Sequence, residues 1–229
     1  KTSWRAWMDF CNDRAIRFCI SEWPLPGNPL DHSELRGMAA FQGVHIHETY
    51  LVFQKLQNPE LADASEAVSQ HHRQLRTAGN LQETIAAYRS YLMEKRRQKA
   101  QGFPVSWGEP SLLCPYLPVE EGDIVMAEPV TNVSLLFGAV RAACKQKRNV
   151  LWGAHIAVDW YLGFPHDEAA TRRFRLMLLL TYIHGGSYGY AENGLFKTNA
   201  YERFDEEDAF CRQNRAVLRS FFYYTRHHP

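Results

Sequence analysis

Residues 149–194 constrain the fold of this chain more than any other stretch. They begin with an apolar run, 150–158, that has the length and composition of a buried strand. A helix follows, because Asp167 can accept a hydrogen bond from its first turn and a pair of glycines can end it. A second short strand, 188–191, comes next. Strand, helix and strand in this order predict two parallel strands joined by a helical crossover.

The same alternation extends over most of the chain. Strand character is found at 15–20, 43–48, 104–107, 123–127, 150–158 and 188–191. Helices are expected at 4–12, 33–41, within 50–101, and at 132–145, 167–183 and 205–227. Six such units suit a doubly wound sheet or most of a (β/α)8 barrel, which has eight. We expect an α/β fold, a (β/α)8 TIM barrel that is complete or incomplete, with about six recognisable units.

The composition is that of an ordinary globular protein. Of the 229 residues, 45% are hydrophobic and 22% are charged, and the formal net charge is +1. This charge does not favour nucleic acid or a membrane surface as a partner, and the longest apolar run is too short to span a bilayer. We expect one α/β-barrel domain over residues 1–229. Because the chain begins at Lys1 without a recognisable signal peptide, we interpret it as a processed form or the C-terminal part of a longer catalytic chain.

Neither the cysteines nor the glycines form a cofactor motif. The five cysteines are scattered and include no CxxC pair, so a zinc knuckle or a thioredoxin-type site is not supported and reduced thiols are expected. Neither GxGxxG after the first strand nor GxxxxGK[ST] is present. No cofactor is therefore expected. The compartment stays open, since reduced thiols favour the cytoplasm and a polysaccharide substrate would favour secretion.

Each predicted strand carries a carboxylate where it leaves the apolar core. These carboxylates are Glu22, Glu48, Glu109, Glu128, Asp159 and Glu192. In parallel α/β folds, ligands bind at the carboxyl ends of the strands. Carboxylates at such positions also cap helices, a role that fits Asp167 well and Glu109 in part. It fits Glu128 and Glu192 less well, because each directly follows an apolar or aromatic run and precedes a turn.

Carboxylates beside aromatic rings are suited to glycosidic cleavage. One carboxylic acid protonates the leaving oxygen, and a second carboxylate attacks the anomeric carbon or activates water. Aromatic residues, 13% of this chain, can stack on sugar rings. The candidates for catalysis are Glu128 and Glu192, followed by Glu48 and Asp159. The candidates for contact with a carbohydrate substrate are Glu22, Trp23, His47, Trp107, Glu109, His155, Trp160, Tyr161, Tyr190 and Asn193.

The stretches DIVMAEP, WGAHIAVDWY and GYAENGLF resemble the C-terminal part of the TIM-barrel glycoside hydrolases. The resemblance covers residues 103–196 and points to no single family. In the best-known clan the acid/base follows the fourth strand in an Asn-Glu pair, which this sequence lacks, and the nucleophile follows the seventh. If the six strands correspond to strands three to eight, the resemblance implies Glu48 and Asp159 as the pair. It also implies that the first two strands are absent from this chain.

Two other functions remain open from the sequence. His45 and His47 form an HxH at a strand end, which resembles the metal-dependent amidohydrolases, whose strand-end histidines bind a divalent metal. His155, His184 and Asp159 are the candidates for the further ligands, and the metal-bridging lysine has no evident counterpart. Alternatively, the aromatic and acidic strand ends could bind glycans without catalysis. A nucleophilic triad is disfavoured, because no G-x-S-x-G is present.

Overall fold

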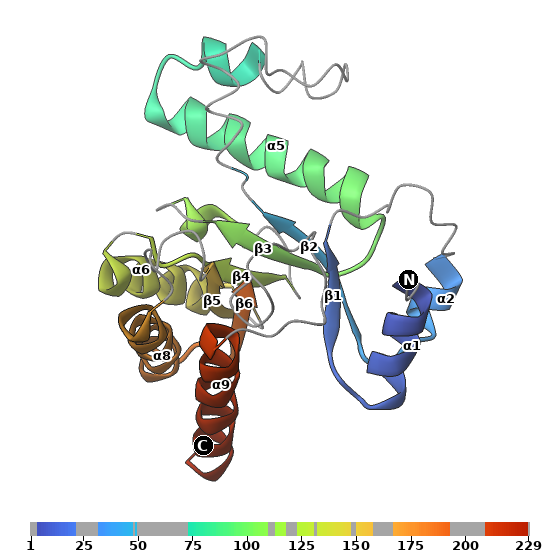
Figure 1. Ribbon diagram of the computed structural model, residues 1–229. Helices are drawn as coiled ribbons and strands as arrows, with labels where there is room; N and C mark the ends of the chain where they lie inside the picture. Colours follow the sequence, from blue (N-terminus) through green and yellow to red (C-terminus); the bar gives the residue numbers. More distant parts are fainter. Residues whose placement is uncertain are drawn as a thin grey trace. The chain divides into compact units, whose positions relative to one another are not determined.

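Six parallel strands form one curled, half-barrel sheet in the order β1-β2-β3-β4-β5-β6 (Figure 1). The computed structural model describes residues 4–21, 32–47, 49, 73–109, 113–117, 123–130, 132–147, 150–157, 167–192 and 209–228. They fall into two compact units, Lys1–Trp107 and Gly108–Pro229. The prediction of an α/β fold with six parallel strands is confirmed, whereas a closed (β/α)8 barrel remains a prediction.

The first unit places helices around strands β1 and β2. Its elements are α1 (Trp4–Asp13), β1 (Phe18–Ser21), α2 (His32–Arg36), β2 (Phe41–His47), α5 (Leu81–Ala100) and the start of β3 (Val105–Glu109). Helix α5 packs on β2 and buries Tyr88 and Leu92. The helical spacing of Leu81, Tyr88 and Leu92 predicts that all three are on the apolar face of this helix, but Leu81, the first residue of α5, is 73% exposed.

A glycine allows β2 to lie between its neighbours in this unit. The register of β1 against β2 shifts between Phe18 and Cys19, which makes the pairing irregular there. Gly43, opposite Cys19, has a φ of +125°, a conformation that residues with a Cβ rarely adopt. A Cβ at this position would lie 2.2 Å from the carbonyl oxygen of Pro104. The next amide, of Val44, donates to that same oxygen at 2.9 Å, so the close approach belongs to the β2–β3 pairing.

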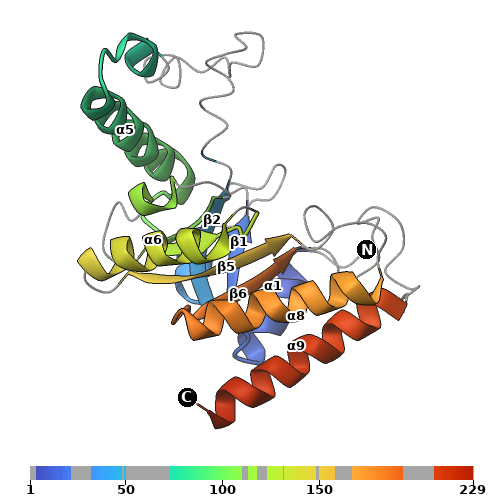
Figure 2. The same ribbon diagram turned by 90° about the vertical axis from the view of Figure 1, so that its left-hand side faces the viewer.

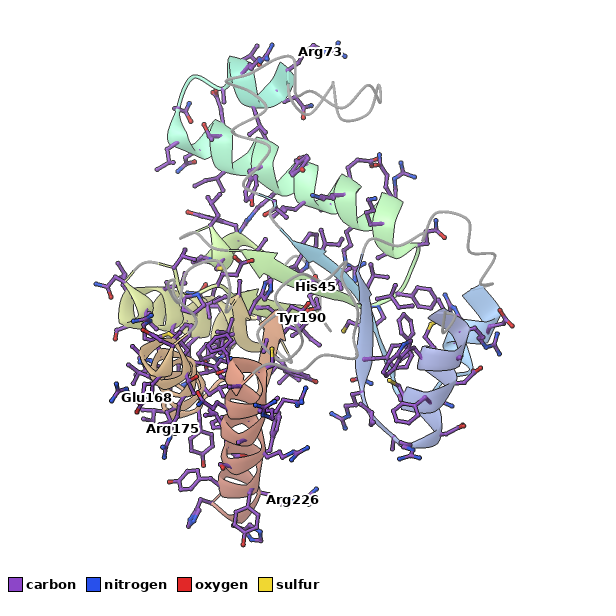
Figure 3. The ribbon with its side chains drawn as sticks, viewed as in Figure 1. His45, Arg73, Glu168, Arg175, Tyr190 and Arg226 are labelled. Carbon is purple, nitrogen blue, oxygen red and sulfur yellow. The ribbon has the colours of Figure 1, made fainter. Side chains whose placement is uncertain are left out.

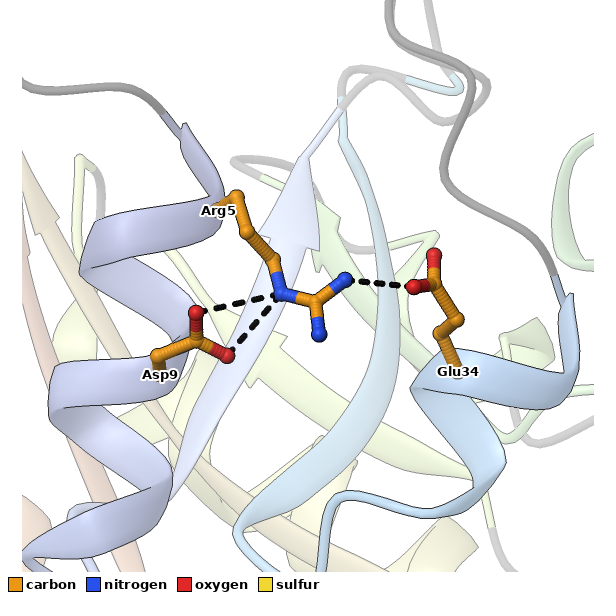
Figure 4. A network of polar contacts seen from close by, with 3 residues as sticks. All are labelled: Arg5, Asp9 and Glu34. Carbon is orange, nitrogen blue, oxygen red and sulfur yellow. Dashed lines mark hydrogen bonds and ion pairs between the residues drawn. The ribbon is translucent and has the colours of Figure 1, made fainter.

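An exposed ion-pair network joins α1 to α2 (Figure 4). Arg5 Nε lies 3.0 Å from Asp9 Oδ1, one turn further along α1, and Arg5 Nη1 lies 2.6 Å from Glu34 Oε1 on α2. Both carboxylates raise the pKa of Arg5, with the hydrogen bond to Glu34 as the largest cause. Because all three side chains are open to solvent, the network fixes geometry more than it stabilises the fold.

The second unit repeats the βα pattern three times. Its elements are the 3-10 turn η2 (Cys114–Tyr116), β4 (Ile124–Ala127), α6 (Val133–Gln146), β5 (Leu151–Ala157), α8 (Glu168–Ile183), β6 (Tyr188–Glu192) and α9 (Ala209–His227). Helices α8 and α9 lie side by side (Figure 2). None of the helices in the described part of the chain is long and apolar enough to cross a bilayer.

The two faces of β5 have different neighbours. Trp152 points to the helix side, where its ring lies 5.3 Å from that of Phe137 on α6. Ala154 and Ile156 share this face by strand alternation, and both are fully buried. His155 therefore belongs to the opposite face, away from α6, and is also buried. Because both faces of β5 are buried, the amino-acid sequence of this strand is almost continuously apolar.

Asn80 and Asn132, like Asp167, directly precede helical stretches of the sequence and predict side-chain caps there, and the structure has all three caps. Asn80 accepts from the Glu83 amide at 2.9 Å, Asn132 from the Leu135 amide at 3.1 Å, and Asp167 from the Ala170 amide at 2.9 Å. Each cap satisfies an amide that has no partner within its own helix. The expected helix starts are thus confirmed, and Asp167 has the structural role that the sequence assigned to it.

Replacing Asp167 with alanine is expected to lower the free energy of unfolding by about 1 kcal/mol, because the Ala170 amide loses its acceptor. Asp167→Asn keeps a side-chain oxygen in the same place and should retain most of that stability. Urea unfolding of the two variants and the wild type measures the difference. Equal stability of Asp167→Ala and wild type would contradict the capping role.

The spacing of the apolar residues in the last helix predicts an inward face made of Phe210, Val217, Leu218, Phe221 and Phe222, and this prediction is partly wrong. Phe210 at the start of α9 is buried, whereas Phe222, also expected inside, is 53% exposed. Tyr182 of α8 makes edge contacts with the rings of Phe221 and Tyr224, with centroids 6.3 and 6.1 Å apart. Helix α8 thus covers one side of this part of α9, and Phe222 lies outside that contact. Periodicity alone could not show where the covering helix ends.

The cysteines are free thiols in the structure, with Cys114, Cys144 and Cys211 buried. Burial raises the pKa of Cys144 to about 12. Because the thiolate is the reactive form, Cys144 is expected to resist iodoacetamide at pH 8 in the folded protein and to react in urea. Mass spectrometry of the labelled peptides measures this, with the half-buried Cys11 as an internal comparison. Equal labelling of Cys144 in the folded and unfolded chain would contradict its burial.

Candidate functional site

Three predicted site residues lie in one row across β4, β5 and β6. His155 on β5 is in register with Tyr190 on β6. Ala127 is in register with Ala154, so Glu128, one residue beyond the end of β4, comes beside His155. By strand alternation the row lies on the sheet face opposite to α6 and α8. Strands β4 to β6 thus bring an acid, an imidazole and a phenol ring together.

The contact between Glu128 and His155 is close and shielded from water. Glu128 Oε1 lies 3.0 Å from His155 Nδ1. The side chain of His155 is 4% exposed and that of Glu128 is 10% exposed. A buried carboxylate is costly without a partner, and the imidazole is a partner that can carry the compensating proton. Within the described part of the chain, the carboxylate of Glu128 makes no other ion pair or hydrogen bond.

Tyr190 lies on the other side of His155 and is the open member of the row. Its ring centroid is 4.6 Å from that of the imidazole, with the two planes tilted by 47°. Tyr190 is nevertheless 45% exposed, so part of its side chain is accessible. Figure 3 labels it on β6. The row therefore runs from a nearly buried acid to an accessible aromatic ring.

Local sequence features place these side chains. Glu128 follows four buried residues of β4, and the amide of Val130 donates to its carbonyl at 2.8 Å, so the chain turns directly after it. On β5, Gly153 lies two residues before His155, and a Cβ there would be 2.2 Å from the carbonyl oxygen of Tyr188. The glycine thus allows β6 to approach closely and brings Tyr190 against His155.

A second polar pair lies in the first unit. His45 Nδ1 on β2 is 3.1 Å from Ser106 Oγ on β3, and Ser106 is 5% exposed. Ser106 was not predicted as a site residue, because nothing in the sequence marks a serine in an apolar strand as the neighbour of His45. Among the described residues, no group of three or more His, Cys, Asp and Glu is arranged to hold a metal ion.

Apart from Trp107, the remaining predicted residues fall into two groups. Three of them are the last residues of their strands: His47 of β2, Glu109 of β3 and Glu192 of β6. Seven predicted residues lie outside the described part of the chain: Glu22, Trp23, Glu48, Asp159, Trp160, Tyr161 and Asn193. Their roles stay predictions.

Trp107 requires a correction. The sequence places this ring at a strand end, where it is expected to stack on a sugar. In the structure Trp107 is 0% exposed and belongs to the core. A ring without accessible surface cannot contact a ligand, so Trp107 does not belong to the candidate site. Trp107 is buried because it lies inside β3, two residues before the strand ends at Glu109. By strand alternation its ring is on the opposite face of the sheet from Ser106.

An open depression of about 750 Å³ lies apart from this row, on α9. It is lined by Arg219, Phe222, Tyr223, Thr225, Arg226 and His227. None of these is a predicted site residue, and all come from one helix. We therefore assign the candidate site to the strand row and not to this depression.

Comparison with known proteins finds no relative of this chain. No protein-family model matches the chain, and no curated protein or solved structure shows significant similarity to it. The function must therefore be argued from the chemistry of the row itself.

Proposed function

We propose that this chain is a glycoside hydrolase in which Glu128 is one of two catalytic carboxylates. The observation that carries the proposal is the row itself: an almost buried acid, 3.0 Å from an imidazole nitrogen, with an accessible tyrosine ring on the other side of that imidazole. Hydrolysis of a glycosidic bond needs an acid to protonate the leaving oxygen and a carboxylate to attack the sugar or activate water. Water supplies the hydroxyl group that remains on the sugar, and no metal or redox partner is required.

Glu192 is the proposed second carboxylate. Its backbone ends β6 two residues after Tyr190, in register with Ala157 on β5. It thus follows Tyr190 toward the carboxyl end of the strand, the edge where parallel α/β folds bind their ligands. Either carboxylate can be the acid and the other the nucleophile or base, and Glu48 and Asp159 remain alternatives for the second role.

Tyr190 is the proposed platform for a sugar ring. Sugar C–H groups pack on aromatic faces, and the phenol hydroxyl can bond a sugar hydroxyl. Its partial exposure suits this role, in contrast to the fully buried Trp107. A non-catalytic glycan-binding protein could use the same ring. The buried acid is the feature that favours hydrolysis, since binding a neutral sugar does not require it.

A panel of aryl glycosides, tested with and without a strong chelator, distinguishes these functions. Release of the aryl group from any member in the presence of chelator would support the two-carboxylate mechanism. Activity lost with chelator and restored by zinc would instead favour the metal-dependent reaction at His45 and His47. If no member is cleaved under either condition, the proposal fails, and a glycan array then tests binding without catalysis.

A further inference from the structure

The geometry points to His155 as the positioning residue of Glu128, which holds Oε1 so that Oε2 is the oxygen presented to the substrate. The role in hydrolysis rests on the glycosidase function proposed above. The sequence alone predicts a different role for His155, direct contact with the carbohydrate substrate. Its 4% side-chain exposure and its contacts on two sides argue against direct binding.

The argument begins with the two oxygens of the carboxylate. Oε1 lies 3.0 Å from the imidazole, and no other polar partner of Glu128 is found among the described residues. A carboxylate has acceptor sites on both oxygens, so Oε2 is left for a ligand. The side chain of Glu128 as a whole keeps 10% of its surface exposed. One oxygen is thus used for orientation and the other for chemistry.

Tyr190 completes the arrangement from the other side. Its ring lies 4.6 Å from that of His155 and belongs to the adjacent strand, in register. The imidazole thus contacts Glu128, just beyond β4, on one side and the ring of Tyr190 on β6 on the other. Positioning of this kind matters, because a misplacement of about 1 Å at a reacting group can cost about a hundredfold in rate.

Two amide substitutions test which imidazole nitrogen matters. His155→Asn places its amide nitrogen close to the position of Nδ1, which contacts Glu128, whereas His155→Gln extends toward the position of Nε2. His155→Leu removes both. We expect kcat on an aryl glycoside to fall by about 30- to 100-fold in His155→Gln and His155→Leu, with KM within about threefold of wild type. His155→Asn should recover most of the lost kcat.

Two results would overturn the positioning role. One is an equal loss of kcat in His155→Asn and His155→Gln. The other is a rise in KM at constant kcat, which would indicate direct binding of substrate. Because the asparagine and glutamine variants are both polar and uncharged, their comparison remains valid if the leucine variant folds poorly. Circular dichroism and thermal melting check that each variant is folded.

A spectroscopic measurement separates this inference from the proposed function. In protein labelled with 15N at histidine, the ring-nitrogen resonances report which nitrogen carries the proton. Glu128→Gln is expected to change the Nδ1 resonance of His155 and to leave that of the distant His227 unchanged. No change at His155 would refute the contact even if glycosides are cleaved. A change at His155 without any cleavage would refute the glycosidase function and leave His155 as the partner of Glu128.

Discussion

Glu128→Gln is expected to lower kcat/KM for glycoside hydrolysis by about a hundredfold or more, the usual contribution of a general acid or base. The change is nearly isosteric, so the fold should persist. Glutamine retains an oxygen that can face His155 Nδ1, but its amide can neither donate a carboxylic proton nor act as a nucleophile. The loss should therefore appear in kcat, measured with the aryl glycoside that the panel identifies as the best substrate.

A matched control is available on α8. Glu168 is a surface carboxylate, with 77% of its side chain exposed and only a loose ion pair at 3.6 Å to Arg172. Glu168→Gln makes the same chemical change outside the row and should leave kcat unaltered. Glu192→Gln should cause a loss comparable to that of Glu128→Gln. Wild-type activity in Glu128→Gln would exclude Glu128 from the mechanism.

Gly43→Ala is expected to lower the free energy of unfolding by about 3 kcal/mol or more. Two physical costs combine at this position. The backbone φ of +125° is unfavourable for any residue with a Cβ, and that Cβ would lie 2.2 Å from the carbonyl oxygen of Pro104. The same oxygen accepts a hydrogen bond from the Val44 amide at 2.9 Å, and moving it away from the added Cβ would strain that bond. Urea or thermal unfolding of the variant measures the effect.

Gly138→Ala is the matched control for this substitution. Gly138 lies on α6 and is exposed, and a Cβ there would meet no atom within 4 Å. Alanine in a helix is more stable than glycine by about 0.5–1 kcal/mol, so this variant should be slightly stabilised. If Gly43→Ala were as stable as the wild type, the bulged pairing of β1, β2 and β3 around Gly43 would be wrong.

Local chemistry allowed much of the fold to be predicted. The starts of α5, α6 and α8 follow from Asn80, Asn132 and Asp167, because a cap depends only on residues three positions apart. The six strands follow from short apolar runs between turn signals. The parallel direction follows from the helices between them, since a parallel connection requires a crossover. Each of these signals lies within a few residues in the sequence.

The candidate site could be predicted only in part. The sequence identified Glu128, His155 and Tyr190 as strand-end or strand residues, but it could not show that they adjoin. Their contact depends on the registers of β4 against β5 and of β5 against β6, and a shift by one residue would move a side chain to the other face. The same uncertainty placed Trp107 in the site, although it faces the core.

The sequence by itself determined the class of fold, the helix starts and the positions of the carboxylates along the chain, because capping and hydrophobic runs act between near neighbours. The tertiary structure decided that Glu128, the strand-end carboxylate whose side chain it describes, lies against His155. Residues 128, 155 and 190 are far apart in the sequence, and only the pairing of three strands brings them within contact distance. Register is a property of the packed sheet, fixed by features such as Gly43 and Gly153 that permit close approach of backbones.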